Sequence, residues 1–93
     1  MEISKMLTIS TAHITEETAN KLDREINENI IGLCVYEKTD FGWFIHVPDD
    51  LEEVVESLRD LCECLLLAKD LGCEWLCLDC DGEVLSYLDT YEW

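Results

Sequence analysis

The stretch EWLCLDCDGEVL, residues 74–85, gathers side chains that could carry chemistry. Asp79 and Asp81 stand two residues apart, a spacing suited to a carboxylate pair that transfers phosphoryl groups or binds a cation. Cys77 and Cys80 form a C-x-x-C, which is typical of redox thiols or of a zinc ligand pair. The stretch also alternates like a strand and contains an Asp-Gly pair, a strong signal for a two-residue hairpin turn. We favour the hairpin, because neither chemical interpretation finds the supporting residues that it needs.

The carboxylate pair resembles the D-x-D-G motif of haloacid-dehalogenase-type phosphotransferases. The resemblance implies that Asp79 would be the nucleophile and Asp81 the general acid–base. However, no lysine or arginine follows the motif to hold a phosphate and neutralise developing charge. Glu83 also stands where that family usually has Thr or Val. A calcium loop would need more oxygen ligands, so we expect no catalytic residue and no cofactor.

The cysteines show no arrangement typical of a redox or metal centre. Redox C-x-x-C motifs lie at a helix N-terminus, whereas strand alternation would place Cys77 and Cys80 on opposite faces of a sheet. A scattered set of Cys34, His46 and Cys77 on one sheet face stays as the alternative metal site. It is weakened because the split sheet order predicted below separates the strands of His46 and Cys77 by one strand. We expect no metal site, and we expect His13 to be a surface or loop residue rather than a metal ligand.

Composition and charge restrict the class of protein. The chain has 93 residues, 22 acidic against six basic, and a net charge of −16. Such a surface repels nucleic acid and anionic membranes and attracts basic protein surfaces. No run of about 20 apolar residues could span a membrane, and the N-terminal stretch does not read as a signal peptide. We therefore expect one cytoplasmic domain over residues 1–93, with its six cysteines reduced.

Hydrophobic periodicity predicts helices and strands in alternation. Helices are expected at residues 16–28, where Thr15 is an N-cap, and at 51–71, where Asp50 and Glu53 resemble a capping box. Strands are expected at residues 5–12, 30–38, 42–47, 75–80 and 83–88, with a turn at 39–42. This order suits an α+β fold: a split β-α-β-β-α-β (ferredoxin-like) antiparallel sheet with both helices on one face, plus a C-terminal hairpin strand.

Strand alternation predicts an aromatic patch on the sheet face away from the helices. Its partner-binding residues would be Tyr36, Phe44, His46 and Trp75. Aromatic sheet faces can stack nucleic-acid bases, but nucleic-acid platforms need Lys and Arg around them. The face could instead form a homodimer or bind another protein. Alternatively, the chain's own tail could cover it, through Tyr87, Leu88, Tyr91 and Trp93.

A second apolar stripe is predicted on the far side of the long helix. It consists of Cys64, Leu67 and Leu71, which recur at helical spacing. These side chains would be exposed to solvent in a monomer. We therefore expect the stripe to contact the C-terminal tail or a partner.

Several phrases resemble a family of small uncharacterised proteins of bacteria, phages and plasmids. They are ISTAHITEETA at residues 9–19, FGWFIHVP at 41–48, LGCEWLCLDCDG at 71–82 and the terminal YEW. The resemblance implies no activity and no catalytic residue. It implies only a mobile-element setting.

Taken together, these features favour a small, acidic, non-enzymatic binding protein. We expect it to dock on a basic, nucleic-acid-binding protein as a nucleic-acid mimic, for example as an anti-CRISPR or anti-restriction inhibitor. The carboxylates expected to bind the partner are Asp49, Asp50, Glu52, Glu53, Glu56, Asp60, Glu63, Asp79, Asp81 and Glu83. The alternatives are a homodimeric structural or regulatory protein and, third, a metal- or thiol-site module. Direct binding to nucleic acid or membrane is not expected.

Overall fold

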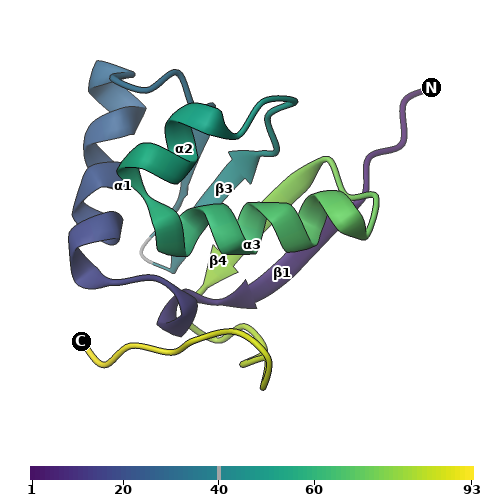
Figure 1. Cartoon of the computed structure of the whole chain (residues 1–93). Coiled ribbons are helices and arrows are strands. Elements are labelled where there is room, and N and C mark those ends of the chain that lie inside the picture. The colour runs from purple at the N-terminus through teal and green to yellow at the C-terminus, as the bar shows by residue number, and fades with distance from the viewer. Residues whose placement is uncertain (40) are drawn as a thin grey trace.

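The protein is a two-layer α+β structure, as the periodicity predicted. The computed structural model describes residues 1–39 and 41–93. Figure 1 shows its helices packed on one face of a four-stranded sheet. The elements in chain order are β1 (Met6–Ser10), the 3₁₀ turn η1 (Thr11–His13), α1 (Glu16–Glu28), β2 (Val35–Lys38), β3 (Gly42–His46), α2 (Glu52–Ser57), α3 (Arg59–Asp70) and β4 (Trp75–Asp79). The turn predicted at 39–42 includes Asp40, which lies outside the described residues.

The strand order is β1-β4-β3-β2, which differs from the ferredoxin-like order. Strand β4 pairs parallel with β1 and antiparallel with β3, so the sheet is not wholly antiparallel as predicted. The physical reason is the apolarity of β4, in which Leu76, Cys77 and Leu78 are all fully buried. Such a strand belongs in the sheet interior, whereas β1 exposes Met6 and Thr8 and takes the edge.

The core lies between the sheet and the helices. Ile9, Ile45, Leu76 and Leu78 are fully buried and point from the sheet toward the helix layer. The helices pack against these residues with apolar side chains at helical spacing, among which Leu22, Leu61 and Leu65 are also fully buried. This interdigitation requires the alternation that the sequence predicted, with Trp43 and Ile45 on the core face of β3 and Phe44 and His46 on the other.

Helix α1 begins and ends as its sequence predicts, but the strand after it is shorter than expected. Thr15 caps the helix, since its Oγ1 accepts the Thr18 N–H at 3.2 Å. At the other end, the carboxylate of Glu25 is 4% exposed. It accepts backbone N–H groups from Ile30, Ile31 and Leu33. Because these donors bond to the helix end, residues 30–33 stay out of the sheet. The Cys34 carbonyl already accepts the His46 N–H at 3.0 Å, and β2 begins at Val35.

The long helix predicted over residues 51–71 is two helices. Leu58 leaves the helical region (φ −142°, ψ 76°) between α2 and α3. Leu58 is nevertheless 3% exposed, and its carbonyl still accepts the Cys62 N–H at 2.9 Å. The break therefore changes the direction of the chain without exposing it to solvent, so that apolar residues of both helices face one core. Asp50 accepts the Glu52 N–H at 2.9 Å rather than forming the predicted capping box.

The C-terminal return strand predicted at residues 83–88 is not formed. A hairpin partner would have to pair with β4, and both edges of β4 are already occupied by β1 and β3. The turn instead carries the chain past the end of β1. Gly82 permits this crossing, because a Cβ there would lie 2.5 Å from the Ile9 carbonyl carbon. Beyond it, the Glu83 carbonyl accepts the Ser10 N–H at 2.9 Å.

His13 binds the tail, residues 80–93, to the end of the sheet. It lies in the 3₁₀ turn η1 between β1 and α1, but it is buried and not at the surface. Its side chain is 2% exposed. The Leu85 N–H donates to Nε2 and the Asp89 carbonyl lies 2.9 Å from Nδ1. Because a carbonyl can only accept, Nδ1 carries a proton and donates to Asp89. Because Nε2 accepts the Leu85 N–H, it carries no proton, so the imidazole in this arrangement is neutral. The Tyr91 N–H also donates to the Ala12 carbonyl at 2.8 Å, which gives the tail another bond to η1 at the lower end of the view in Figure 1.

Replacement of His13 by Ala should loosen the tail and destabilise the fold. The change removes two hydrogen bonds and leaves the Leu85 N–H and the Asp89 carbonyl unpaired, at a cost of about 2–3 kcal/mol. Urea unfolding would measure the loss, and limited proteolysis should cut the tail faster. His46→Ala is the matched control, because His46 is exposed. Equal losses in the two variants would show that the His13 bonds do not hold the tail.

Candidate functional site

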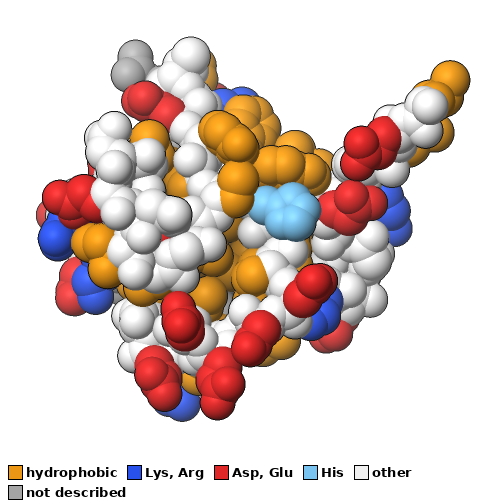
Figure 2. Space-filling view, turned by 90° about the horizontal axis from the view of Figure 1, so that it is seen from above, with side chains coloured by type: hydrophobic (Ala, Val, Ile, Leu, Met, Phe, Trp, Pro, Cys, Tyr) orange, Lys and Arg blue, Asp and Glu red, His pale blue; other side chains and the backbone are white. Residues whose placement is uncertain are grey.

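Exposed carboxylates cover the helix layer. Those predicted to bind a partner and found exposed there are Asp49, Asp50, Glu52, Glu53, Glu56 and Glu63, here called the helix-layer carboxylates. None of them makes an ion pair within residues 1–39 and 41–93, where the pairs found join Lys21 to Glu17, Arg24 to Glu28 and Lys38 to Asp79. Acidic side chains are likewise spread over the face seen in Figure 2. The layer therefore presents negative charge that the chain itself does not neutralise.

Asp60 is separated from that set by its hydrogen bonds. Its Oδ2 accepts the Thr15 N–H at 2.8 Å, and its Oδ1 accepts the Thr18 hydroxyl at 2.8 Å. The carboxylate thus sits at the N-terminus of α1, where a negative charge favours the helix dipole. This position ties α3 to α1. The Asp60 carboxylate has a structural role, and it is not part of the exposed surface.

Asp79 is also engaged internally, unlike its neighbours Asp81 and Glu83, which are exposed. Its Oδ1 accepts the Asp81 N–H at 2.8 Å and its Oδ2 pairs with the Lys38 ammonium. The two side chains meet across Gly42, which is opposite Lys38 on one side and Asp79 on the other. The Lys38 ammonium, with the Asp81 N–H, lowers the pKa of the Asp79 carboxyl, and Asp79 raises the pKa of Lys38.

The sheet face away from the helices brings together all four predicted aromatic-face residues, Tyr36, Phe44, His46 and Trp75, here called the open sheet face. Tyr36 lies opposite Phe44, and His46 lies opposite Trp75. Ring centroids are 6.0 Å apart for Tyr36–Trp75 and 5.0 Å, edge to face, for His46–Trp75. Figure 2 shows hydrophobic side chains gathered beside the pale-blue histidine.

The tail does not cover the open sheet face, which was one of the alternatives that the sequence allowed. Leu85 and Leu88 pack against the core on the helix side, and the Trp93 indole donates to the Ile14 carbonyl at 2.8 Å. The second apolar stripe is covered in part, since Cys64 is 1% exposed while Leu71 is 49% exposed. Leu67 is half-buried and lines a shallow hollow together with Tyr87 and Leu88 of the tail, so the tail lies beside the middle of the stripe and leaves Leu71 open.

The thiols are not brought together. All six cysteines are free. Strands β3 and β4 are neighbours, so the argument that His46 and Cys77 lie two strands apart was wrong. Even so, among the described residues only Asp79, Cys80 and Asp81 place three metal-capable atoms within 4.8 Å of one another. Burial raises the pKa of the Cys64 thiol to about 12, which disfavours the reactive thiolate.

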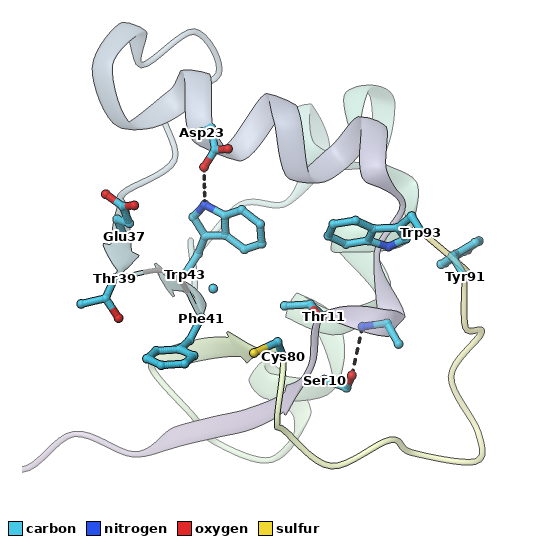
Figure 3. A pocket seen from close by; sticks show the side chains of 12 residues that line it. Ser10, Thr11, Asp23, Glu37, Thr39, Phe41, Trp43, Cys80, Tyr91 and Trp93 are labelled. Atoms are coloured by element: carbon cyan, nitrogen blue, oxygen red, sulfur yellow. Dashed lines mark hydrogen bonds between the residues drawn. The ribbon is translucent and has the colours of Figure 1, made fainter.

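A cleft that sequence reasoning did not find lies between α1, the β2–β3 hairpin and the tail (Figure 3). Its volume is about 520 Å³. Trp43 and Trp93 flank it, and the carboxylates of Asp23 and Glu37 line its rim. The Trp43 indole donates to Asp23 Oδ1 at 2.9 Å. No local motif could have indicated this site, because its walls come from four separate parts of the chain.

Asp79→Asn should remove a specific part of the pH dependence of stability. The pKa of Asp79 in the folded protein lies below its usual value of 3.8, so the ion pair stabilises the protein above that pH. This stabilisation is lost as the pH falls through the folded value. The variant should therefore be less stable than the native protein near pH 7, and the difference should shrink below pH 4. Urea unfolding between pH 3 and 7 would measure it.

The exposed neighbour Asp81 provides the control, since Asp81→Asn leaves the Lys38 pair in place. Its stability near pH 7 should stay close to that of the native protein, because the Lys38–Asp79 pair is intact. A difference for Asp79→Asn that stays constant from pH 7 to pH 3 would contradict the assignment.

Comparison with known proteins shows a family but no function. Neither the search of curated proteins nor the search of solved structures found a match. Within the described residues, no helix is long and apolar enough to cross a membrane. A family model matches residues 6–93, and it is described as the C-terminal domain of a family of unknown function, DUF5983. The prediction of an uncharacterised family is thereby confirmed, and the chain belongs to the DUF5983 family.

Proposed function

We propose that this protein is a non-enzymatic acidic module that binds a basic protein surface through its helix-layer carboxylates. The observation that carries the proposal is that these six side chains are exposed and make no ion pair within the described chain. With a net charge of −16, the chain attracts basic partners over a distance and repels nucleic acid. A basic patch is the electrostatic footprint of a surface that binds nucleic acid, which favours a partner of that kind.

The arrangement of the carboxylates supports mimicry of a phosphate backbone. Glu52 and Glu56 lie four residues apart on α2, so their side chains are about 5–6 Å apart on one helix side. Duplex DNA carries one charge per about 1.7 Å of its axis. The helix layer is therefore a sparser copy, and binding would depend on fewer contacts. An inhibitor of a nucleic-acid-binding enzyme, including one of a CRISPR or restriction system, is the role that this surface would suit.

The proposal is tested by removing charge from the helix layer. The variant Glu52→Gln, Glu53→Gln, Glu56→Gln and Glu63→Gln should bind the partner at least tenfold more weakly, because each lost contact contributes several tenths of a kcal/mol or more. The assay is capture from host lysate with elution in salt steps, followed by competition with duplex DNA. A captured nucleic-acid-binding protein should elute at moderate salt and be displaced by DNA.

A matched control changes the same number of charges elsewhere. Glu16, Glu17, Glu28 and Glu74 are all exposed and lie outside the helix-layer set. Their replacement by Gln should leave capture almost unchanged. If both variants weaken capture of the partner equally, the effect depends only on net charge and not on the helix-layer carboxylates. A partner that survives high salt and ignores DNA would overturn the mimicry.

A second candidate is a homodimer that is structural or regulatory in role. It is favoured by the open sheet face, where Tyr36 is 54% exposed beside Trp75, since exposed aromatic clusters often centre protein contacts. Analytical ultracentrifugation should then show a dimer at micromolar concentration that Tyr36→Glu converts to a monomer. A native monomer at all salt concentrations would remove this candidate.

A further inference from the structure

We propose that the cleft flanked by Trp43 and Trp93 binds the guanidinium group of an arginine side chain. The arginine would be presented by a basic partner, and in that respect the inference rests on the proposed function. The cleft chemistry itself depends on different residues from the helix layer. The two can therefore fail separately.

The first argument is the aromatic lining. Trp43 comes from β3, Phe41 precedes that strand, and Trp93 comes from the tail, so the rings converge from distant parts of the chain (Figure 3). Arginine guanidinium groups are attracted to the faces of such rings, and tryptophan is the strongest partner. A volume of about 520 Å³ lies within the range of ligand sites in proteins. The cleft is large enough for a long side chain.

The second argument is the charge around the cleft. Asp23 and Glu37 are its two charged lining residues, and no basic side chain lines it within the described residues. Lys38 follows Glu37 in β2 but turns to the opposite sheet face, where it pairs with Asp79. An anionic ligand would be repelled. A neutral aromatic ligand could stack but would leave the carboxylates without a partner.

The third argument is that the walls are held in position. Asp23 Oδ1 accepts the Trp43 indole N–H, which orients both side chains. Asp23 Oδ2 has no hydrogen-bond partner within the described residues and remains able to accept from a ligand. The Trp93 indole donates to the Ile14 carbonyl, and the tail that carries it is fastened through His13. A preformed site loses less conformational entropy on binding.

Arginine fits these features better than lysine. Its guanidinium is planar, so it can stack on an indole while its N–H fork reaches a carboxylate. It is also more weakly hydrated than an ammonium, which reduces the cost of entering an aromatic cleft. The lysine ammonium can meet only one of these requirements at a time.

The test is a titration with the short peptide acetyl-Gly-Arg-Gly-amide, at about 0.15 M salt, where the Debye length is about 8 Å. The readout is the NMR signal of each indole N–H, and the chain has three tryptophans. The signals of Trp43 and Trp93 should shift and saturate, whereas that of Trp75, on the open sheet face, should not. The same peptide with citrulline, which is neutral, should bind at least tenfold more weakly, equivalent to about 1.4 kcal/mol.

Variants identify the groups responsible. Asp23→Asn keeps an oxygen that can accept the Trp43 indole N–H while removing the charge. Combined with Glu37→Gln, it should weaken arginine peptide binding at least tenfold while the protein stays folded. Equal binding of the citrulline peptide, unchanged binding by this double variant, or a shift of Trp75 alone would each overturn the inference.

The helix-layer variant separates the two proposals. It should bind the arginine peptide within about twofold of the native protein, because its four substitutions lie outside the cleft. If the peptide binds in the cleft while no basic protein is captured, the proposed function fails and the cleft inference stands. If the partner is captured while the peptide does not bind, the cleft inference is wrong.

Discussion

The position of β4 at the centre of the sheet is the constraint on which the rest of the structure depends. Its residues Leu76, Cys77 and Leu78 are fully buried. Pairing with β1 on one edge and β3 on the other provides hydrogen-bond partners for its backbone N–H and carbonyl groups. This placement moves β1 to the edge. It also brings Trp75 opposite His46, which assembles the open sheet face. Finally, it leaves no free edge for the chain that follows, so the tail must find other partners.

The tail finds them at the end of β1 and in η1. Gly82 lets the chain pass close to Ile9, and His13 accepts and donates hydrogen bonds inside the tail. Trp93 then reaches the Ile14 carbonyl, two residues before α1 begins. The cleft is thus a consequence of strand order. Had the tail formed a fifth strand, Trp93 would not be bonded to Ile14 or stand across from Trp43.

The many carboxylates divide into two groups with different physical roles. Asp60, Asp79 and Asp23 accept from donors that are far away in the sequence and so hold distant elements together. Glu25 instead holds the chain that directly follows its own helix. Hydrogen bonds to a charged acceptor are stronger than neutral ones, which offsets part of the self-repulsion of an acidic chain. The helix-layer carboxylates bond to no distant element within the described residues. They contribute to the negative external field of the protein, on which the proposed recognition of a basic partner depends.

The sequence by itself determined what depends on neighbours along the chain. The bounds of α1, its Thr15 cap, the two faces of β3 and the residues of the open sheet face all follow from local capping and from periods of 3.6 and 2. Only the tertiary structure decided the strand order, the break at Leu58, the loss of the return strand, the burial of His13 and the cleft. Each of these depends on which edges and donors remain free after distant segments have packed, and no local pattern contains that information.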